Sequence, residues 1–170
     1  MVRSCTLKGK PLALQGPELK VGDAAPDVVL KSSLVEQVRI ASTNGKVRIF
    51  SVVPSLDTPV CSQQTKRFNE EATKLKNVDF YTVSVDLPPA QARYCGAENI
   101  NKDRLKFLSD YMDVGFGRSW GTLIPELRIE CRAAFVLDPA GVIRYAEYVP
   151  EVANLPNFDA VLECARKVSG

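Results

Sequence analysis

An apolar strand that runs directly into a helix is the feature of this sequence that most limits its fold. Residues 47–53 are rich in β-branched side chains and end at Pro54, which is typical of a buried strand closed by a breaker. Thr58 then fits the N-cap position of a helix, and Pro59 fits its first helical position, where no N–H is needed. Counting from Thr58, Cys61 is the third helical residue. We therefore predict a strand–turn–helix unit that presents a cysteine in the first helical turn.

A cysteine in that position is a candidate nucleophile. Unpaired backbone N–H groups and the positive end of the helix dipole favour the reactive thiolate there. The structural alternative is a buried cysteine that packs as a small apolar side chain. The sequence contains no histidine, so Cys–His and Ser–His–Asp arrangements are excluded, and arginine must help to stabilise a thiolate. It also contains no C-x-x-C pair, which excludes a zinc site of the usual spacing.

The elements on either side of this unit predict an α/β fold. Strands are expected at residues 6–8, 11–14, 27–30, 37–40, 47–53, 77–86, 133–137 and 142–148. Helical segments are expected from Thr58 onward, within 87–100, as a turn or two at 103–110, and over 157–168. This order predicts a thioredoxin-like fold in which helices flank a central mixed sheet, with an N-terminal β-hairpin extension. We expect residues 1–170 to form a single domain.

Charge and cysteine content limit the possible partners and the compartment. The formal net charge is +2, and lysines and arginines are interspersed with acids, so nothing indicates nucleic-acid binding. No stretch approaches the ~18 apolar residues of a membrane span, and no apolar segment follows the charged N-terminus as in a signal peptide. Five cysteines, an odd number, favour reduced or redox-active thiols over structural disulfides. We therefore expect a cytoplasmic protein that binds neither nucleic acid nor membrane.

Several segments carry a resemblance to a known family. Residues 54–61, PSLDTPVC, resemble the P-x-x-x-T-x-x-C peroxidatic motif of peroxiredoxins, and residues 51–58 resemble the bacterial thiol peroxidase subfamily in particular. Residues 84–96 resemble the segment that carries the resolving cysteine of that subfamily. Residues 132–138 resemble the strand whose arginine faces the peroxidatic sulfur. The resemblance covers essentially the whole chain, because two N-terminal segments also fit, at residues 8–11 and 20–27.

The resemblance implies a thioredoxin-dependent peroxidase that reduces hydrogen peroxide and alkyl hydroperoxides. Cys61 would attack the peroxide and become a sulfenic acid, and Cys95 would condense with it to an intramolecular disulfide that thioredoxin reduces. Thr58 would hold thiolate and peroxide, and Pro54 would shield the sulfur from water. Arg132 would stabilise the thiolate and polarise the peroxide oxygens. The family uses no metal or organic cofactor, and its members are typically homodimers.

Each of these residues also has a purely structural interpretation. Thr58 fits a helix cap, Pro54 the end of a strand, Arg132 a surface charge on an edge strand, and Cys95 a packed thiol. For Thr58 both interpretations are compatible, since a cap position would bring its hydroxyl near the sulfur. For Arg132, the lack of histidine makes a catalytic arginine more necessary.

Other questions stay open at this stage. The same sulfenic acid would serve a redox relay that passes its disulfide to a partner protein, whereas a dithiol–disulfide oxidoreductase is disfavoured by the missing C-x-x-C. The aromatic, glycine-rich stretch 116–121 is interpreted as a loop that lies at a dimer interface. The resemblance implies no role for Cys5, Cys131 or Cys164, and Cys131 is expected in the core.

Overall fold

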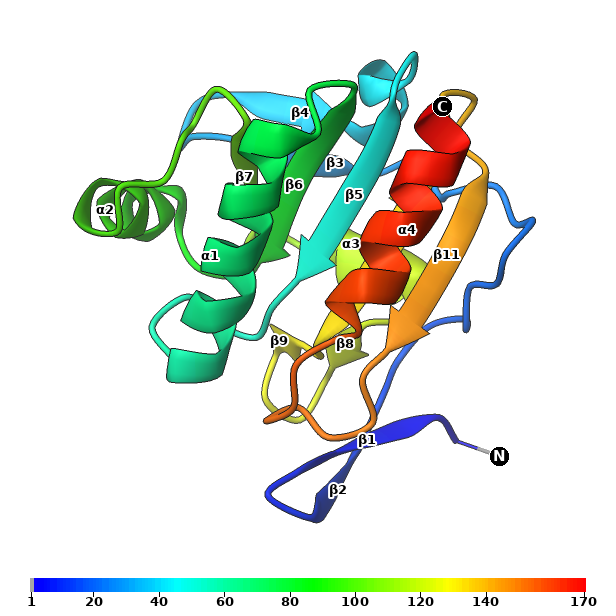
Figure 1. Ribbon diagram of the computed structural model, residues 1–170. Coiled ribbons are helices and arrows are strands. Elements are labelled where there is room, and N and C mark those ends of the chain that lie inside the picture. Colours follow the sequence, from blue (N-terminus) through cyan, green and yellow to red (C-terminus); the bar gives the residue numbers. More distant parts are fainter. Residues whose placement is uncertain (1) are drawn as a thin grey trace.

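A seven-stranded mixed sheet forms the centre of the protein in a computed structural model that describes residues 2–170 (Figure 1). The strands follow the order β11-β10-β5-β6-β7-β3-β4, so strands far apart in the sequence become neighbours. Within the sheet β5, β6 and β7 run parallel, and the other pairs are antiparallel. The bounds are β3 (Val29–Lys31), β4 (Gln37–Arg39), β5 (Val47–Val52), β6 (Val78–Ser84), β7 (Leu105–Ser109), β10 (Ala133–Leu137) and β11 (Ile143–Tyr148).

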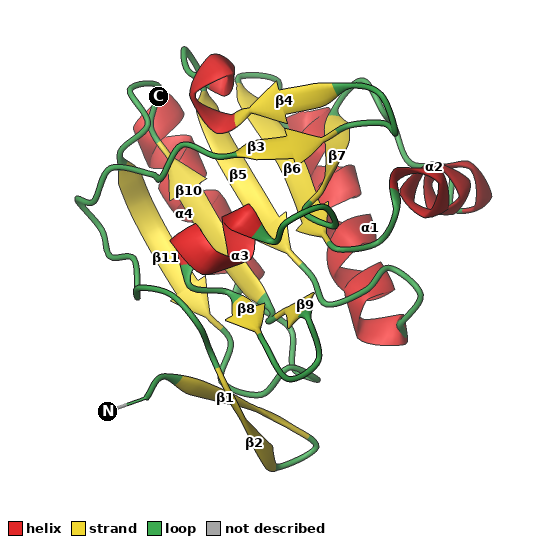
Figure 2. Ribbon diagram, turned by 180° about the vertical axis from the view of Figure 1, so that it is seen from behind, coloured by secondary structure: helices red, strands yellow, loops and turns green. Residues whose placement is uncertain are grey.

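Helices cover both faces of this sheet. The helices α1 (Pro59–Lys74) and α4 (Phe158–Ser169) lie on one face, and α3 (Gly115–Trp120) lies on the other, as Figures 1 and 2 show from opposite sides. The helix α2 (Pro88–Ala97) stands beyond the β7 side, and a short 3-10 helix, η1 (Ile40–Thr43), precedes β5. Each face buries its own apolar cluster, so the central strands are apolar on both sides. The predicted thioredoxin-like α/β fold is confirmed.

The β5–α1–β6 unit follows from the local sequence. Every residue of β5 is buried, and the strand pairs in parallel with β6 along its whole length. Parallel neighbours need a crossover connection, and α1 provides it. Phe68 and Ala72 on α1 are fully buried against the sheet, which is the face that the spacing of apolar residues predicts. Thr58 occupies the N-cap position and Pro59 begins the helix, as predicted.

The N-terminal extension is a hairpin of β1 (Ser4–Leu7) and β2 (Lys10–Ala13), and it lies at the end of the molecule where β11 ends (Figure 1). Its turn falls at Lys8-Gly9, one residue earlier than the sequence suggests. Lys8 and Gly9 have φ values of 51° and 78°. Positive φ at both central residues is typical of a type I′ turn, a two-residue turn whose twist matches that of the flanking strands.

The prediction of helical turns at residues 103–110 is wrong. Leu105–Ser109 form the strand β7, which pairs in parallel with β6 from Phe80–Leu105 to Ser84–Ser109. Leu105 and Leu108 belong to the apolar clusters on opposite faces of the sheet. Pairing with β6 and burial on both faces therefore outweigh the weak local signal of this short segment.

The interpretation of residues 116–121 as a loop is also wrong, whereas their place at a dimer interface stays a prediction. This stretch lies mainly in α3, and the rings of Phe116 and Trp120 are fully buried and stack with centroids 4.5 Å apart. The Trp120 indole N–H donates to the Pro26 carbonyl oxygen at 3.0 Å. These aromatic side chains fill the core on the α3 face of the sheet. A small hairpin that the sequence did not predict follows α3, formed by β8 (Leu123–Ile124) and β9 (Ile129–Glu130).

A buried pair of carboxyl groups joins α3 to β9. Asp110 accepts hydrogen bonds from the backbone N–H groups of Phe116 and Gly117, at 3.0 and 2.9 Å. Glu130 is fully buried, interacts with Asp110 and accepts a hydrogen bond from the Thr122 hydroxyl. A side chain at position 117 would have its Cβ 2.9 Å from both carboxylate oxygens of Glu130 and from Leu123 Cβ, so it would displace these neighbours. Burial raises the pKa of Glu130 well above its ordinary value, and the neighbouring Asp110 raises it further.

This pair predicts a specific pH dependence of stability. The folded state keeps Glu130 protonated at pH values where the unfolded chain has released the proton, so folding becomes less favourable as pH rises through the ordinary glutamate range. The free energy of unfolding falls by about 1.4 kcal/mol per pH unit until the pKa of Glu130 in the folded state is reached. Glu130→Gln should remove this pH dependence, because an amide does not titrate in this range and its oxygen still accepts from the Thr122 hydroxyl. Urea unfolding at pH 5 and pH 8 measures this effect. The free energy of unfolding should fall less between the two pH values for the variant than for the wild type. Equal losses in the two proteins would contradict this account.

Candidate active site

Cys61 lies at the junction between the central strand and its crossover helix. The chain leaves β5 at Val52, passes the buried Pro54, and enters α1 after Thr58. Cys61 is in the first turn of α1 and is fully buried. The sequence-based prediction of its position is confirmed.

Arg132 is the charged group that reaches the sulfur. One guanidinium nitrogen, Nη2, donates to Cys61 Sγ at 3.4 Å. The arginine immediately precedes β10, which is the antiparallel neighbour of β5 with Ala133 opposite Val52. Strand pairing therefore places Arg132 beside the loop that leaves β5. A cation beside a sulfur favours its thiolate form.

The guanidinium is held in place on its other sides. Its Nε donates to the Val152 carbonyl oxygen at 2.7 Å, and Nη1 donates to Gln64 Oε1 at 2.9 Å. Gln64 in turn donates to the Ser51 hydroxyl at 2.7 Å. Arg132 is only 2% exposed, so it has exchanged water for these partners. The interpretation of Arg132 as a surface charge is wrong.

Gln64 is a site residue that the sequence reasoning missed. It is fully buried and follows Cys61 by three positions on α1. Residues three apart lie on the same face of a helix, so a glutamine at this spacing on the face that carries Cys61 was a usable signal. Its amide connects the arginine to β5, which fixes the direction of the guanidinium.

Thr58 differs in part from its expected geometry. Its backbone is at the N-cap, and its carbonyl accepts the first helical hydrogen bond from Ser62 N–H at 3.0 Å. Its hydroxyl makes no capping bond and instead donates to the Ser55 carbonyl oxygen at 2.9 Å. The side chain is exposed. A role of Thr58 toward peroxide therefore stays a prediction, since its hydroxyl must turn away from Ser55 to take part.

Cys95 lies in α2 and is not bonded to Cys61, because all five cysteines are free thiols. Both sulfurs belong to the apolar cluster under α1, so the two helices share one core. The Tyr94 and Ser62 hydroxyls are 2.9 Å apart, and the Lys66 ammonium is 2.6 Å from the Glu98 carboxylate. These contacts hold α2 against α1 while the thiols are reduced.

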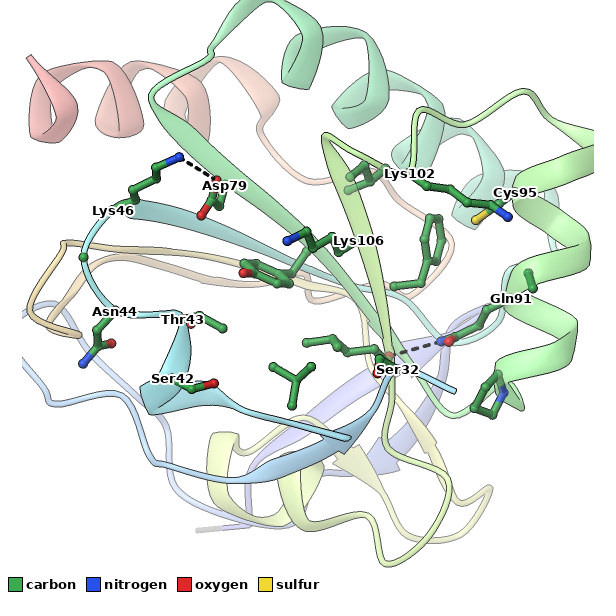
Figure 3. Close-up of a pocket in the computed structure, with 18 residues that line it drawn as sticks. Ser32, Ser42, Thr43, Asn44, Lys46, Asp79, Gln91, Cys95, Lys102 and Lys106 are labelled. Carbon is green, nitrogen blue, oxygen red and sulfur yellow. Dashed lines mark hydrogen bonds and ion pairs between the residues drawn. The ribbon is translucent and has the colours of Figure 1, made fainter. Parts of the chain in front are cut away.

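A pocket and a groove lie on opposite sides of α2. A pocket of about 270 Å³ is lined by the first turn of α1, including Thr58, and by Tyr94 of α2. A larger groove of about 880 Å³ runs beside β7, and Cys95 and Lys102 line one end of it (Figure 3). Burial raises the pKa of the Cys95 thiol to about 11, and the Lys102 ammonium opposes that rise only partly. The resting Cys95 is therefore a protonated thiol.

The remaining cysteines lie outside this arrangement. Cys5 and Cys131 are buried in the cluster on the α3 face, which confirms Cys131 as a core residue, and Cys164 on α4 is partly exposed. Burial raises the pKa of the Cys131 thiol, so it is unreactive. Residues 2–170 hold no cluster of three or more cysteines and carboxylates suited to a metal ion. In the same range, no helix is both long and apolar enough to cross a bilayer.

Comparisons with known proteins show the family of this chain. The family model described as Redoxin matches residues 20–162. The "Thiol peroxidase" of Bacillus subtilis is 51% identical over 161 residues, covering 95% of each chain. That of Listeria monocytogenes serotype 4b is 46% identical over 162 residues, covering 95% of this chain and 97% of the relative. The crystal structure of a peroxiredoxin-like protein from Aquifex aeolicus superposes with a TM-score of 0.90 at 38% identity, covering 99% of this chain and 98% of that one. A thiol peroxidase from Chromobacterium violaceum shares the fold, with a TM-score of 0.87 at 18% identity and 98% coverage of both chains.

Proposed function

The chain belongs to the Redoxin family and, within it, to the thiol peroxidases, and we propose that it reduces hydroperoxides with Cys61 as the nucleophile. The observation that carries this proposal is the 3.4 Å contact between Arg132 Nη2 and Cys61 Sγ, two groups that are both buried. Hydrogen peroxide and alkyl hydroperoxides are the proposed substrates.

In the first step the Cys61 thiolate attacks one oxygen of the peroxide. An S–O bond forms as the O–O bond breaks, and the sulfur is oxidised to a sulfenic acid. The other oxygen of the peroxide takes up a proton and leaves as water or an alcohol. Charge moves from sulfur to the leaving oxygen during this step. The positioned Arg132 guanidinium is suited to stabilise charge on both atoms, since it is fixed before the reaction begins.

Two neighbouring residues complete the proposed site. Pro54 is buried in the loop before α1, which supports its proposed role of keeping water from the sulfur. Thr58 lines the pocket at the first turn of α1, and we propose that its hydroxyl turns from Ser55 to bind the peroxide.

In the second step Cys95 condenses with the sulfenic acid. The new S–S bond replaces the S–O bond, and water leaves with the proton of the Cys95 thiol. A disulfide requires Cα atoms about 4.4–6.8 Å apart, and we propose that α2 gives up its Tyr94–Ser62 contact and unwinds locally to form it.

We further propose that thioredoxin reduces this disulfide by exchange, that the protein acts in the cytoplasm, and that it forms a homodimer. These assignments rest on the similarity to thiol peroxidases. The alternative function, a redox relay to a partner protein, has the same first two steps. Sustained turnover with excess thioredoxin supports the peroxidase, and a stalled disulfide that only another protein discharges supports the relay.

Replacing Arg132 tests the observation on which this proposal rests. Arg132→Met should slow peroxide reduction by about 10²-fold or more and move its pH profile to higher pH, because the thiolate loses its cation. Arg132→Lys is the matched control, since it keeps the charge but loses the planar fork that contacts Val152, Gln64 and Cys61 together. The rate of peroxide reduction by Arg132→Lys should lie between those of the wild type and Arg132→Met. Stopped-flow peroxide kinetics from pH 5 to 9 measure both effects, and an unchanged profile in Arg132→Met would exclude the role assigned to this arginine.

A further inference from the structure

A chain of hydrogen bonds connects Arg132 to the segment that follows β11. Arg132 Nε donates to the Val152 carbonyl oxygen at 2.7 Å, and the Val149 N–H donates to the Arg132 carbonyl oxygen at 2.9 Å. Both the side chain and the backbone of the arginine are therefore bound by residues 149–152. The direction of the guanidinium toward Cys61 depends on where the Val152 carbonyl lies.

The N-terminal hairpin holds that segment in place. The Val152 N–H donates to the Thr6 carbonyl oxygen at 2.8 Å, and the Thr6 N–H donates to the Pro150 carbonyl oxygen at 2.7 Å. These two bonds form a parallel bridge between Thr6 on β1 and Glu151. Glu151 thus sits between the two points at which the hairpin is attached.

The Glu151 carboxylate is bound by the hairpin itself. Its Oε2 accepts from the Thr6 hydroxyl at 2.7 Å and from the Gly9 N–H at 3.1 Å. Its Oε1 accepts from the N–H groups of Lys8 and Ala153, at 3.0 and 3.1 Å. The positive φ angles of Lys8 and Gly9 are what turn two successive N–H groups toward one anion. These donors lower the pKa of Glu151 to about 2, so the group stays charged across the working pH range.

We propose that Glu151 is a positioning residue for the peroxidatic site, which acts through Val152 on Arg132 and makes the N-terminal hairpin a support for the catalytic arginine. The proposal rests on the proposed role of Arg132. Glu151 itself touches neither Cys61 nor the peroxide. Without its carboxylate, the hairpin turn loses its anion and residues 150–152 lose an attachment. The Val152 carbonyl then moves from Arg132 Nε, and the guanidinium no longer has a single direction toward the sulfur.

Glu151→Gln tests the proposal. The amide keeps the size of the side chain but presents an NH₂ group to N–H donors, so it cannot satisfy both sides of the turn. We expect kcat/KM for peroxide to fall about tenfold, since a small misplacement of a catalytic group costs up to about 10²-fold. We also expect the pH profile of Cys61 alkylation by iodoacetamide to move to higher pH, in the direction of Arg132→Met.

A matched control separates positioning from general stability. Asp27 is another carboxylate that accepts from a distant backbone N–H, that of Ala41 at 2.9 Å, and it also binds the Arg39 side chain at 2.8 Å. Within residues 2–170, the Asp27 carboxylate makes no hydrogen bond or ion pair with residues 149–152 or with Arg132. Asp27→Asn should lower the melting temperature while leaving kcat/KM and the alkylation profile at their wild-type values. Thr6→Val removes only the hydroxyl that binds Glu151 and should cause a twofold to threefold fall in the same direction.

A double variant completes the test. In an Arg132→Met background, Glu151→Gln should cause no further loss of kcat/KM, because the group through which it acts is gone. Wild-type kinetics and an unchanged alkylation profile in both Glu151→Gln and Thr6→Val would overturn the proposal, and Thr6→Val still decides it where Glu151→Gln does not fold. If Arg132→Met slows the reaction and these variants do not, only the role of Glu151 fails. If Arg132→Met has no effect, the proposed role of Arg132 fails first.

Discussion

Replacing Cys61 with serine should abolish peroxide reduction and leave the fold intact. The variant loses the thiolate, and serine has no base nearby to activate it because the chain contains no histidine. We expect the rate to fall by at least about 10⁴-fold, as for other enzymes that lose their nucleophile. Serine is close to cysteine in size, and its hydroxyl can accept from the Arg132 guanidinium that contacts the sulfur. The cost in stability should therefore be about 1 kcal/mol.

A coupled assay with thioredoxin, thioredoxin reductase and NADPH measures this effect with hydrogen peroxide and with cumene hydroperoxide. Cys164→Ser is the matched control for loss of a thiol, because Cys164 is partly exposed on α4 and lies outside the site. It should keep wild-type turnover. Substantial thioredoxin-linked turnover in Cys61→Ser would show that another thiol is the nucleophile.

Replacing Cys95 with serine should separate the two half-reactions. The first turnover needs only the Cys61 thiolate and should survive, whereas later turnovers need a partner thiol to convert the sulfenic acid to a disulfide. We expect a burst of about one peroxide per chain, followed by a stall with thioredoxin and faster over-oxidation of Cys61. Because Cys95 is one wall residue of a groove on α2, the substitution should leave the Arg132–Cys61 contact unchanged.

Two measurements check this prediction. Rapid-quench peroxide consumption gives the size of the burst, and mass spectrometry of the oxidised wild type gives the disulfide partners. The proposed mechanism requires a bond between Cys61 and Cys95 within one chain. A bond between subunits, or a bond from Cys61 to Cys5, Cys131 or Cys164, would overturn the role of Cys95 while leaving Cys61 as the nucleophile.

The position of Cys61 in the fold was readable from the sequence because the signals that determine it are local. A β-branched run that ends at Pro54, followed by Thr58-Pro59, specifies a strand and a helix start within a few residues, and this places Cys61 in the first turn. The absence of histidine pointed to an arginine as the activating charge. The structure brings Arg132 to that sulfur.

The elements that the sequence misjudged are those whose state depends on distant partners. Leu105–Ser109 become a strand because β6 offers a parallel edge, and Phe116 and Trp120 become core residues because the sheet offers an apolar face. A short segment carries too little local preference to decide between such states.

The support of the site was decided by the tertiary structure alone. Arg132 and Cys61 are 71 positions apart, and Glu151 lies 145 positions from the Thr6 hydroxyl that it binds. Hydrogen bonds over such separations exist only after β10 has paired with β5 and the hairpin has docked on residues 150–152. The sequence by itself determined that Cys61 lies in the first turn of α1, because helix capping acts over neighbouring residues. Strand order determined which groups hold the arginine against that sulfur, because it brings together residues that share no local pattern.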